Sequence, residues 1–303
     1  MSSRRFSVRV PASTSNLGSG FDTVSAALGL YLTVGVEVTG EGGVRWIPKW
    51  RSSEENILDR ALRVSSLALD LRIPGMRLEV SNPIPFKRGL GSSGAAVIAG
   101  IKIAEKVKGA DLSQEEVLKI AYPLEGHPDN LAASLLGGWV ISRLSEGSVK
   151  VERLLSTLQC RFVMAIPEVT ISTRKARAIL PEKYPLRDVV YNLQRCALLV
   201  HALGSGRGEL LREAVGDALH QPYRRRLVPG LAEVLERQGA PDQAAGSLLA
   251  LFISGSGSAV AAVADGHFHE IGEWMVRTFE RAGISARYLI LNLDTAGARV
   301  EVG

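Results

Sequence analysis

The fold of this chain is decided by Pro85-Phe-Lys-Arg-Gly-Leu-Gly-Ser-Ser-Gly-Ala-Ala96, a glycine-rich stretch between a strand and a helix. The strand-like run covers residues 76–80, and helical apolar periodicity runs from Gly94 to Lys108. A glycine-rich turn that opens a helix leaves backbone N–H groups unpaired, and the positive end of the helix dipole lies at the same point. The stretch therefore predicts a phosphate-binding strand–loop–helix unit.

The side chains of this loop also suit an anionic ligand. Its three glycines let the backbone approach a ligand closely, and Ser92 and Ser93 add hydroxyls for phosphate oxygens or a metal ion. Lys87 and Arg88 bring positive charge to the mouth of the loop. A tight turn without a ligand is the plain alternative, but two adjacent serines and two cations are more than a turn needs.

The order of residues in the loop limits the kind of nucleotide site that it could form. It is not a Walker A loop, because no Gly-Lys-Ser/Thr follows the glycines. Residues 89–94 do read as GxGxxG, the fingerprint of a dinucleotide site and hence of a dehydrogenase. That fingerprint follows its strand directly, whereas Pro83 and Pro85 intervene here, and Asp111 falls in a loop rather than at a strand end. A dehydrogenase is therefore a weak alternative.

Length and composition favour a two-domain enzyme of the cytoplasm that acts on small molecules. The 303 residues leave room for two domains, and we expect an N-terminal domain over residues 1–156, which carries the glycine-rich loop, and a C-terminal domain over residues 157–303. The net charge is +5 and only 6% of residues are aromatic, which argues against nucleic-acid binding. Two cysteines fit a reducing compartment, and neither a signal peptide nor a run long enough to span a bilayer is recognisable.

Apolar patterning predicts most of the remaining elements. The first strand is expected to break at a loop over residues 11–22, and residues 46–50 are expected to return as a hairpin after residues 41–43. A helix is expected from Asn56 to about Leu71, and the change of domain near residues 147–158. The second half reads as a β–α–α–β–β–α–β sandwich, whose second helix is predicted over residues 209–219.

A second polar cluster lies at a helix junction, Glu125-Gly-His-Pro-Asp-Asn130. Glu125 is a natural ligand for Mg²⁺, which prefers carboxylate oxygen. His127 and Asn130 could hold a hydroxylic substrate. The alternative is that Asp129 and Asn130 only cap the next helix, and Asp129 is expected to do no more than that.

Three further segments carry candidate binding residues. Asn16 and Asp22 could offer an amide and a carboxylate to a polar ligand. Thr173 and Arg177 are four residues apart on a predicted helix and therefore share a face. One arginine of the run at residues 224–226 could clamp a carboxylate if it pointed inward.

Taken together, residues 11–22, 85–95 and 254–258 resemble the three motifs of the GHMP kinases, in order over nearly the whole chain. The 125–130 cluster, Ser172-Thr-Arg-Lys-Ala-Arg177 and His220-Gln-Pro-Tyr-Arg224 are similar to segments of the homoserine kinases within that superfamily. Departures are small: Ser15 and Ser19 stand where the first motif often has Ala and Pro, and the third motif lacks a common Pro.

The resemblance implies an α+β fold with two domains. The N-terminal α/β domain would contain a left-handed βαβ crossover, an exception to the usual right-handed rule, and the C-terminal domain would be a ferredoxin-like α/β sandwich. It also implies ATP-dependent phosphorylation of the side-chain hydroxyl of L-homoserine, in threonine biosynthesis, by direct attack on the γ-phosphate without a strong general base. ATP and Mg²⁺ would be the cofactors.

The resemblance further implies roles for individual residues. The ATP phosphates would be held by the loop Pro85, Phe86, Lys87, Arg88, Gly89, Leu90, Gly91, Ser92, Ser93, Gly94 and Ala95. The adenine would face Asn56, and Mg²⁺ would be bound by Ser93 and Glu125. The homoserine pocket would consist of Asn16, Asp22, His127, Asn130, Thr173, Arg177 and Arg224. The catalytic group would be Ser93, Glu125 and Asn130.

Other functions remain open from the sequence. A GHMP kinase could act on another small alcohol, such as shikimate or mevalonate, or the protein could be a sensor that binds ATP and substrate without catalysis. The two predicted metal ligands argue against a sensor, because a pure binding protein would not need a metal placed there. The sequence does not decide the oligomeric state, and a homodimer is one possibility.

Overall fold

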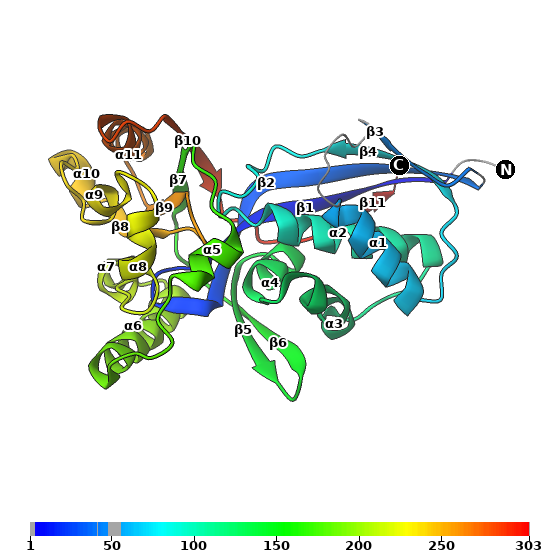
Figure 1. The fold of residues 1–303 in the computed structure, drawn as a ribbon, viewed down its shortest axis with the longest axis horizontal. Coiled ribbons are helices and arrows are strands. Elements are labelled where there is room, and N and C mark those ends of the chain that lie inside the picture. Colours follow the sequence, from blue (N-terminus) through cyan, green and yellow to red (C-terminus); the bar gives the residue numbers. More distant parts are fainter. Residues whose placement is uncertain (1–3, 41, 48–55, 303) are drawn as a thin grey trace.

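Two separate β-sheets organise the chain in the computed structural model, which describes residues 4–40, 42–47 and 56–302. The elements of the first half surround one sheet, and most of the second half surrounds the other (Figure 1). Within the described residues, no helix has both the length and the apolar character needed to cross a membrane.

The first sheet has seven strands and is built on a long hairpin. Its strands are β1 (Arg4–Asn16), β2 (Gly20–Gly40), β3 (Val44–Ile47), β4 (Gly75–Ser81), β5 (Trp139–Ser145), β6 (Ser148–Leu154) and β11 (Arg299–Val302). They follow the order β11-β1-β2-β4-β3, with β5 paired to β2 and β6 paired to β5. Alternate apolar side chains of β1, such as Val8 and Val10, are fully buried, as expected for a strand with one covered face.

Four helices cover one face of this sheet (Figure 1). They are α1 (Ile57–Ala68), α2 (Ser92–Lys108), α3 (Gln114–Glu125) and α4 (Asp129–Leu136). Asn56 caps α1 at the predicted helix start, and a capping box of Ser113 and Glu116 opens α3. Helix α2 packs against β1 and α4, which places its N-terminus beside the end of the hairpin.

The second sheet is antiparallel with the order β10-β7-β9-β8. Its strands are β7 (Arg161–Pro167), β8 (Leu248–Ile253), β9 (Val260–Ala264) and β10 (Ala286–Asn292). The longer helices are α6 (Leu186–Ser205) and α11 (Phe268–Arg281). The short ones are α5 (Thr173–Ala178), η1 (Gly208–Leu210), α7 (Leu211–Ala214), α8 (Gln221–Arg224), η2 (Arg225–Leu227), α9 (Leu231–Leu235) and α10 (Asp242–Ala245). The four strands and two main helix positions follow the predicted β–α–α–β–β–α–β succession.

The predicted loop over residues 11–22 is wrong for its first half, because β1 continues to Asn16. Ser13, Thr14 and Ser15 are buried in the strand, and partners elsewhere in the fold satisfy their hydroxyls. A run of small polar residues predicts a loop when the sequence does not reveal the partners of their hydroxyls.

Three further expectations need correction. β3 is not the return strand of a hairpin: it pairs in parallel with β4, because α1 crosses over between them. Residues 41 and 48–50 of that expectation lie outside the described part. The change of domain expected near residues 147–158 does not begin at residue 147, because residues 148–154 form β6 of the first sheet. The helix predicted over residues 209–219 ends at Ala214, since Asp217 accepts from the backbone N–H groups of His220 and Gln221 and begins α8 instead.

The division at residues 156 and 157 stays a prediction. Residues 155–160 connect the last strand of one hairpin with β7 of the second sheet. The chain then returns at its end, where β11 pairs with β1 in the first sheet. The handedness of the crossover through α1 likewise stays a prediction.

Candidate active site

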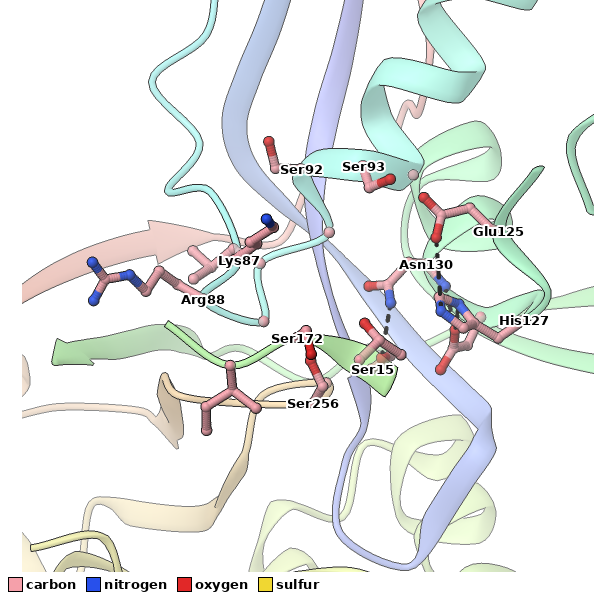
Figure 2. A pocket seen from close by; sticks show the side chains of 18 of the residues that line it. Ser15, Lys87, Arg88, Ser92, Ser93, Glu125, His127, Asn130, Ser172 and Ser256 are labelled. Carbon is pink, nitrogen blue, oxygen red and sulfur yellow. Dashed lines mark hydrogen bonds and ion pairs between the residues drawn. The ribbon is translucent and has the colours of Figure 1, made fainter. Parts of the chain in front are cut away.

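A cleft of about 300 Å³ opens where the two halves of the chain meet. One wall carries β1, the 85–94 loop and the 125–130 segment, and the other carries residues 171–177, Arg224 and the turn at residues 255–256. Figure 2 shows side chains from both walls directed into the same space. The cleft therefore gathers all the motifs singled out in the sequence.

Main-chain groups build one end of the cleft. Gly91 precedes α2 with a φ of 68°, and no side chain caps the helix. The first N–H groups of α2 are thus left for a ligand, with the positive end of the dipole behind them. A Cβ on Gly91 would lie 2.0 Å from the Ser13 hydroxyl, so glycine is required both by the conformation and by the close packing.

The two serines of the loop point in different directions. Ser92 Oγ accepts a hydrogen bond from the side-chain amide of Asn82 at 3.3 Å. The Ser93 hydroxyl turns the other way, toward Glu125 (Figure 2). Only Ser93 is therefore oriented like the metal ligand that the sequence predicts.

The turn at residues 254–258 braces the phosphate loop against β1. The Ser254 hydroxyl lies 2.6 Å from the Gly89 carbonyl oxygen and 2.8 Å from the Thr14 hydroxyl. Gly255 donates its N–H to the Ser15 carbonyl at 3.1 Å. The third motif thus joins the first two, and a Cβ on Gly89 would lie 2.0 Å from the Ser254 carbonyl oxygen.

The two cations of the loop are less free than the sequence suggested. Both line the cleft, but the Arg88 guanidinium donates a hydrogen bond to the Pro167 carbonyl at the end of β7. The Lys87 ammonium lies 5.0 Å from the centre of the Phe86 ring. The second sheet therefore holds the Arg88 guanidinium, and the role of Arg88 at the mouth of the loop stays a prediction.

Glu125 and Ser93 form a fitting pair of ligands for a divalent cation. Burial raises the pKa of the Glu125 carboxyl, while the hydrogen bond with Ser93 lowers it. Glu125 Oε1 is buried without a hydrogen-bond partner, which is costly unless a cation or another donor binds there. The described residues hold no cluster of three or more acidic, His or Cys side chains able to bind a metal, and Mg²⁺ needs only one or two carboxylates beside phosphate oxygens.

His127 lies between two carboxylates. Its Nε2 is 3.7 Å from Glu125 Oε2, and its Nδ1 is 3.5 Å from Asp129 Oδ1. Burial works against the charged ring, but the neighbouring Asp129 and Glu125 raise the pKa of His127 overall. The pKa of Asp129 is lowered: its complete burial acts in the opposite direction but is outweighed by His127 and by hydrogen bonds.

Asp129 is more than the helix cap expected from the sequence. The N-cap of α4 is Pro128, and Asp129 is the first helical residue. Its side chain is 2% exposed and lines the cleft, where it faces His127 and accepts the Asn130 backbone N–H at 2.8 Å. The expectation is corrected because the carboxylate is buried against a histidine instead of standing in solvent.

Two serines of β1 fix the Asn130 side chain. Ser13 donates to Asn130 Oδ1 at 2.9 Å. Asn130 Nδ2 donates to Ser15 Oγ at 3.1 Å, as Figure 2 shows. Alternate residues of a strand point to the same face, so Ser13 and Ser15 reach the same amide. One N–H of the amide remains for a ligand.

Asp22 and Arg177 are bound to each other. The guanidinium donates two parallel hydrogen bonds to the carboxylate, at 2.9 Å and 2.7 Å. Asn16 supports the pair, because its Oδ1 accepts the Asp22 backbone N–H at 3.0 Å and its Nδ2 donates to the Gly255 carbonyl at 2.8 Å. The sequence placed both charges in one pocket but gave no sign that they pair.

Arg224 is the inward-pointing arginine of its run. It is 2% exposed and donates to the carbonyls of Ala176 at 3.2 Å and Gly255 at 3.0 Å. Its Nη1 also lies 3.4 Å from His220 Nδ1. Burial, together with nearby Arg177, lowers the pKa of Arg224 to about 10.

All but two of the predicted site residues line this cleft. Asn56 does not, since its Oδ1 accepts from the N–H groups of Leu58 and Asp59 at the start of α1. Ala95 is buried inside α2. The cleft also contains residues that sequence reasoning did not propose: Ser15, Ile57, Asp129, Ile171, Ser172, Gly255 and Ser256. Spacing along β1 could have indicated Ser15, whereas the others depend on distant contacts.

The chain is similar to known kinases over nearly its whole length. The model of the GHMP kinases N terminal domain matches residues 56–138. A homoserine kinase of Persephonella marina is 37% identical over 298 residues, covering 97% of this chain and 98% of that protein. One from Thermus thermophilus is 42% identical over 256 residues, covering 84% and 85%.

Solved structures show the same architecture. The crystal structure of homoserine kinase from Cytophaga hutchinsonii has a TM-score of 0.86 at 25% identity, covering 99% of this chain and 98% of that one. A mevalonate kinase has a TM-score of 0.69 at 14% identity, a likeness of fold alone. The predicted two-domain α+β fold is thereby confirmed.

Proposed function

The chain belongs to the homoserine kinase family of the GHMP kinases, and we propose that its cleft transfers the γ-phosphate of ATP to the side-chain hydroxyl of L-homoserine. It is an ATP-dependent homoserine kinase with Mg²⁺ as metal cofactor, and its product, O-phospho-L-homoserine, belongs to threonine biosynthesis. One observation carries the proposal: a single cleft joins an uncapped helix N-terminus, a buried acid beside a serine, and two arginines near an aspartate.

The ATP phosphates belong at the main-chain end of the cleft. The uncapped N–H groups of α2 and the hydroxyls of the loop suit phosphate oxygens. Ser93 and Glu125 would hold Mg²⁺, which when bound neutralises charge on the phosphates. The orphaned oxygen of Glu125 supports this assignment. The adenine contact of Asn56 stays a prediction, with Ile57 as the neighbouring residue that lines the cleft.

Homoserine belongs at the side-chain end. Arg224 and Arg177 would bind its carboxylate, and Asp22 would bind its ammonium. Asn16 and Thr173 complete this part of the wall. Asn130, held by two serines, has one N–H left to donate to the hydroxyl oxygen that attacks the phosphate.

The reaction proceeds without a strong general base. Phosphoryl transfer is largely dissociative, so positioning and charge stabilisation supply most of the catalysis, and the hydroxyl proton leaves late. Asp22 is occupied by Arg177 or by the ammonium, and both ring nitrogens of His127 face carboxylates. His127 therefore orients the pocket, and His127→Gln is expected to retain at least about a tenth of kcat, whereas loss of a true acid–base group costs about 10²–10⁴-fold.

A panel of alcohols tests the function. ADP release is measured with ATP, Mg²⁺ and one acceptor each: homoserine, shikimate, mevalonate or none. We expect kcat/KM to be highest for homoserine by at least about 10², because only homoserine meets both arginines and Asp22. Preference for another alcohol would identify a different GHMP kinase. ATP binding without turnover of any acceptor would identify a sensor.

Location and assembly complete the proposal. The chain is proposed to work in the cytoplasm without membrane or nucleic-acid partners, as its modest net charge of +5 and its two free cysteines suggest. Burial raises the pKa of Cys160 to about 12, so that thiol stays protonated and poorly reactive. Cell fractionation tests the location, and sedimentation velocity tests whether the chain forms a homodimer.

A further inference from the structure

The ion pair of Asp22 and Arg177 stands where the substrate is expected to bind. Its two hydrogen bonds are 2.9 Å and 2.7 Å long, and the side chains are 34% and 38% exposed toward a cleft that both of them line. The two groups that would bind the substrate's ammonium and carboxylate are thus already bound to each other. A ligand can engage them only by taking the place of one partner.

Arg224 is in the opposite situation. Within the described part of the chain, no carboxylate lies within 4.0 Å of its guanidinium, although the side chain is 2% exposed. Its hydrogen bonds go to the carbonyls of Ala176 and Gly255, which are neutral acceptors. Asp22, Asp217 and Asp129 act on Arg224 only from beyond 4.0 Å. A buried cation without a directly bound counter-ion is costly, so an anion that reaches the Arg224 guanidinium would stabilise it.

Building on the proposed function, we infer that homoserine binds by exchanging partners with this ion pair. The substrate's ammonium replaces Arg177 on Asp22, and its carboxylate bridges Arg224 and the released Arg177. Each charge of the site that loses a partner gains another. A ligand with only one of the two charges must either leave the pair closed and bind Arg224 alone, or open it and strand one charge. The closed pair therefore selects zwitterionic amino acids over hydroxy acids and amino alcohols.

The surroundings suit such an exchange. Asp22 is fixed through its backbone, because Asn16 accepts its N–H at 3.0 Å. Arg177 is long and flexible, and its guanidinium carbon lies 5.6 Å from the centre of the Phe21 ring, while that of Arg224 lies 5.1 Å from the same centre. Both guanidinium groups thus lie beside the Phe21 ring, which also stacks on His220 with ring centres 5.0 Å apart. A shift of Arg177 from Asp22 toward Arg224 would keep its guanidinium near this ring.

The experiment compares four proteins with three ligands. The proteins are the wild type, Asp22→Asn, Arg177→Gln and the double variant. The ligands are homoserine, 4-hydroxybutanoate, which lacks the ammonium, and 3-amino-1-propanol, which lacks the carboxylate. Kd is measured by isothermal titration calorimetry, and kcat/KM by ADP release. Circular dichroism and the Kd for ATP confirm that each variant is folded.

Exchange predicts gains for the single-charge ligands. Asp22→Asn frees Arg177 and should tighten 4-hydroxybutanoate about tenfold, while homoserine weakens. Arg177→Gln frees Asp22 and should tighten 3-amino-1-propanol by a similar factor. The gain for 4-hydroxybutanoate needs Arg177, so the double variant should bind this ligand no more tightly than Arg177→Gln does. The gain for 3-amino-1-propanol needs Asp22, so the double variant should bind that ligand no more tightly than Asp22→Asn does.

Two results would overturn the inference. Unchanged or weaker binding of both single-charge ligands in the single variants would show that the pair does not compete with them. Asp22→Asn could also tighten 4-hydroxybutanoate by the same factor when Arg177→Gln is already present. The gain would then come from the loss of repulsion by the Asp22 carboxylate and not from the release of Arg177. The proposed function fails separately, through a wild-type protein that does not phosphorylate homoserine at all.

Discussion

The two ends of the cleft differ in whether backbone or side-chain groups form them. The phosphate end consists mainly of backbone: glycines in left-handed conformations, an uncapped helix start and a turn that braces it. The homoserine end consists of side chains from distant segments, among them Asp22, Arg177 and Arg224. Phosphate is common to every kinase of this fold, so its site can be fixed in the main chain, whereas the acceptor's site must be tuned by side chains.

This difference has a consequence for mutations. A backbone site does not titrate and has few side chains to remove, so it should respond mainly to steric changes. A side-chain site responds to charge, pH and the loss of single partners. The predictions below test this contrast, beginning at the metal ligands, where the two ends meet.

Removal of a metal ligand should have the largest effect. Glu125→Ala and Ser93→Ala are each expected to lower kcat about 10³-fold with the fold intact, because both remove stabilisation of charge that develops during transfer. Glu115→Ala on the same helix is the control, since its exposed carboxylate only pairs with Lys150. Stabilisation of the protein by Mg²⁺ with ATP, measured as a rise in Tm, should fall in the two variants and not in the control. Two variants with wild-type kcat would exclude these residues as metal ligands.

Loss of the buried arginine should come next. Arg224→Gln is expected to cost about 2–4 kcal/mol in kcat/KM for homoserine, as for a charge-assisted hydrogen bond to a carboxylate. Its kcat/KM for 3-amino-1-propanol should hardly change, because that acceptor has no carboxylate. Arg225→Gln serves as the control, since Arg225 is exposed and pairs with Glu236. Equal losses for both acceptors would assign Arg224 to stability or to ATP instead.

The phosphate end should be sensitive to a single methyl group. Gly91→Ala places a Cβ 2.0 Å from the Ser13 hydroxyl at a φ of 68°. Gly109→Ala is a matched control at the other end of α2, with a φ of 74° and nothing within 4 Å. The control should lose about 1 kcal/mol of folding stability, because alanine is strained at a positive φ. Gly91→Ala should lose about 1–3 kcal/mol more from overpacking and should also raise KM for ATP. Equal Tm and equal KM for ATP in the two variants would argue against a built backbone site.

The same contrast explains how far the sequence could be read. The strand–loop–helix unit around residues 85–96, the start of α1 at Asn56 and the strand succession of the second half depend on neighbours in sequence, and these structural predictions are confirmed. The continuation of β1 to Asn16 depends on partners more than a hundred residues away, and Asp129 is buried partly against Ser15 of that same strand. Local patterns carry no information about such contacts. The ion pair of Asp22 and Arg177, 155 residues apart, was unreadable for the same reason.

The smallest predicted effect is a pH dependence confined to the homoserine end. His220 is fully buried, and its Nε2 lies 2.8 Å from the Gly18 carbonyl oxygen. A carbonyl only accepts, so Nε2 carries the proton and Nδ1 is free to accept from Arg224 Nη1 at 3.4 Å. Burial lowers the pKa of His220, and Asp217 only partly opposes this. The neutral ring therefore persists at neutral pH and supports Arg224.

Acidification should reverse that support. Since the folded pKa of His220 is depressed, its contribution to stability is complete above the unfolded value of about 6.5 and is lost as the pH falls through the folded value. Protonation places a second cation against Arg224 and removes its acceptor, so KM for homoserine should rise as the pH falls below the unfolded value and through the folded value. In His220→Gln the amide cannot titrate, and this rise should disappear. KM for the fully ionised magnesium complex of ATP should have the same pH dependence in both proteins, because His220 contacts Gly18 and Arg224 and not the phosphate loop. If the rise in KM for homoserine persists unchanged in His220→Gln, His220 does not cause it. If acid raises KM for ATP as much as KM for homoserine in the wild type, the two ends of the cleft do not differ in their pH dependence.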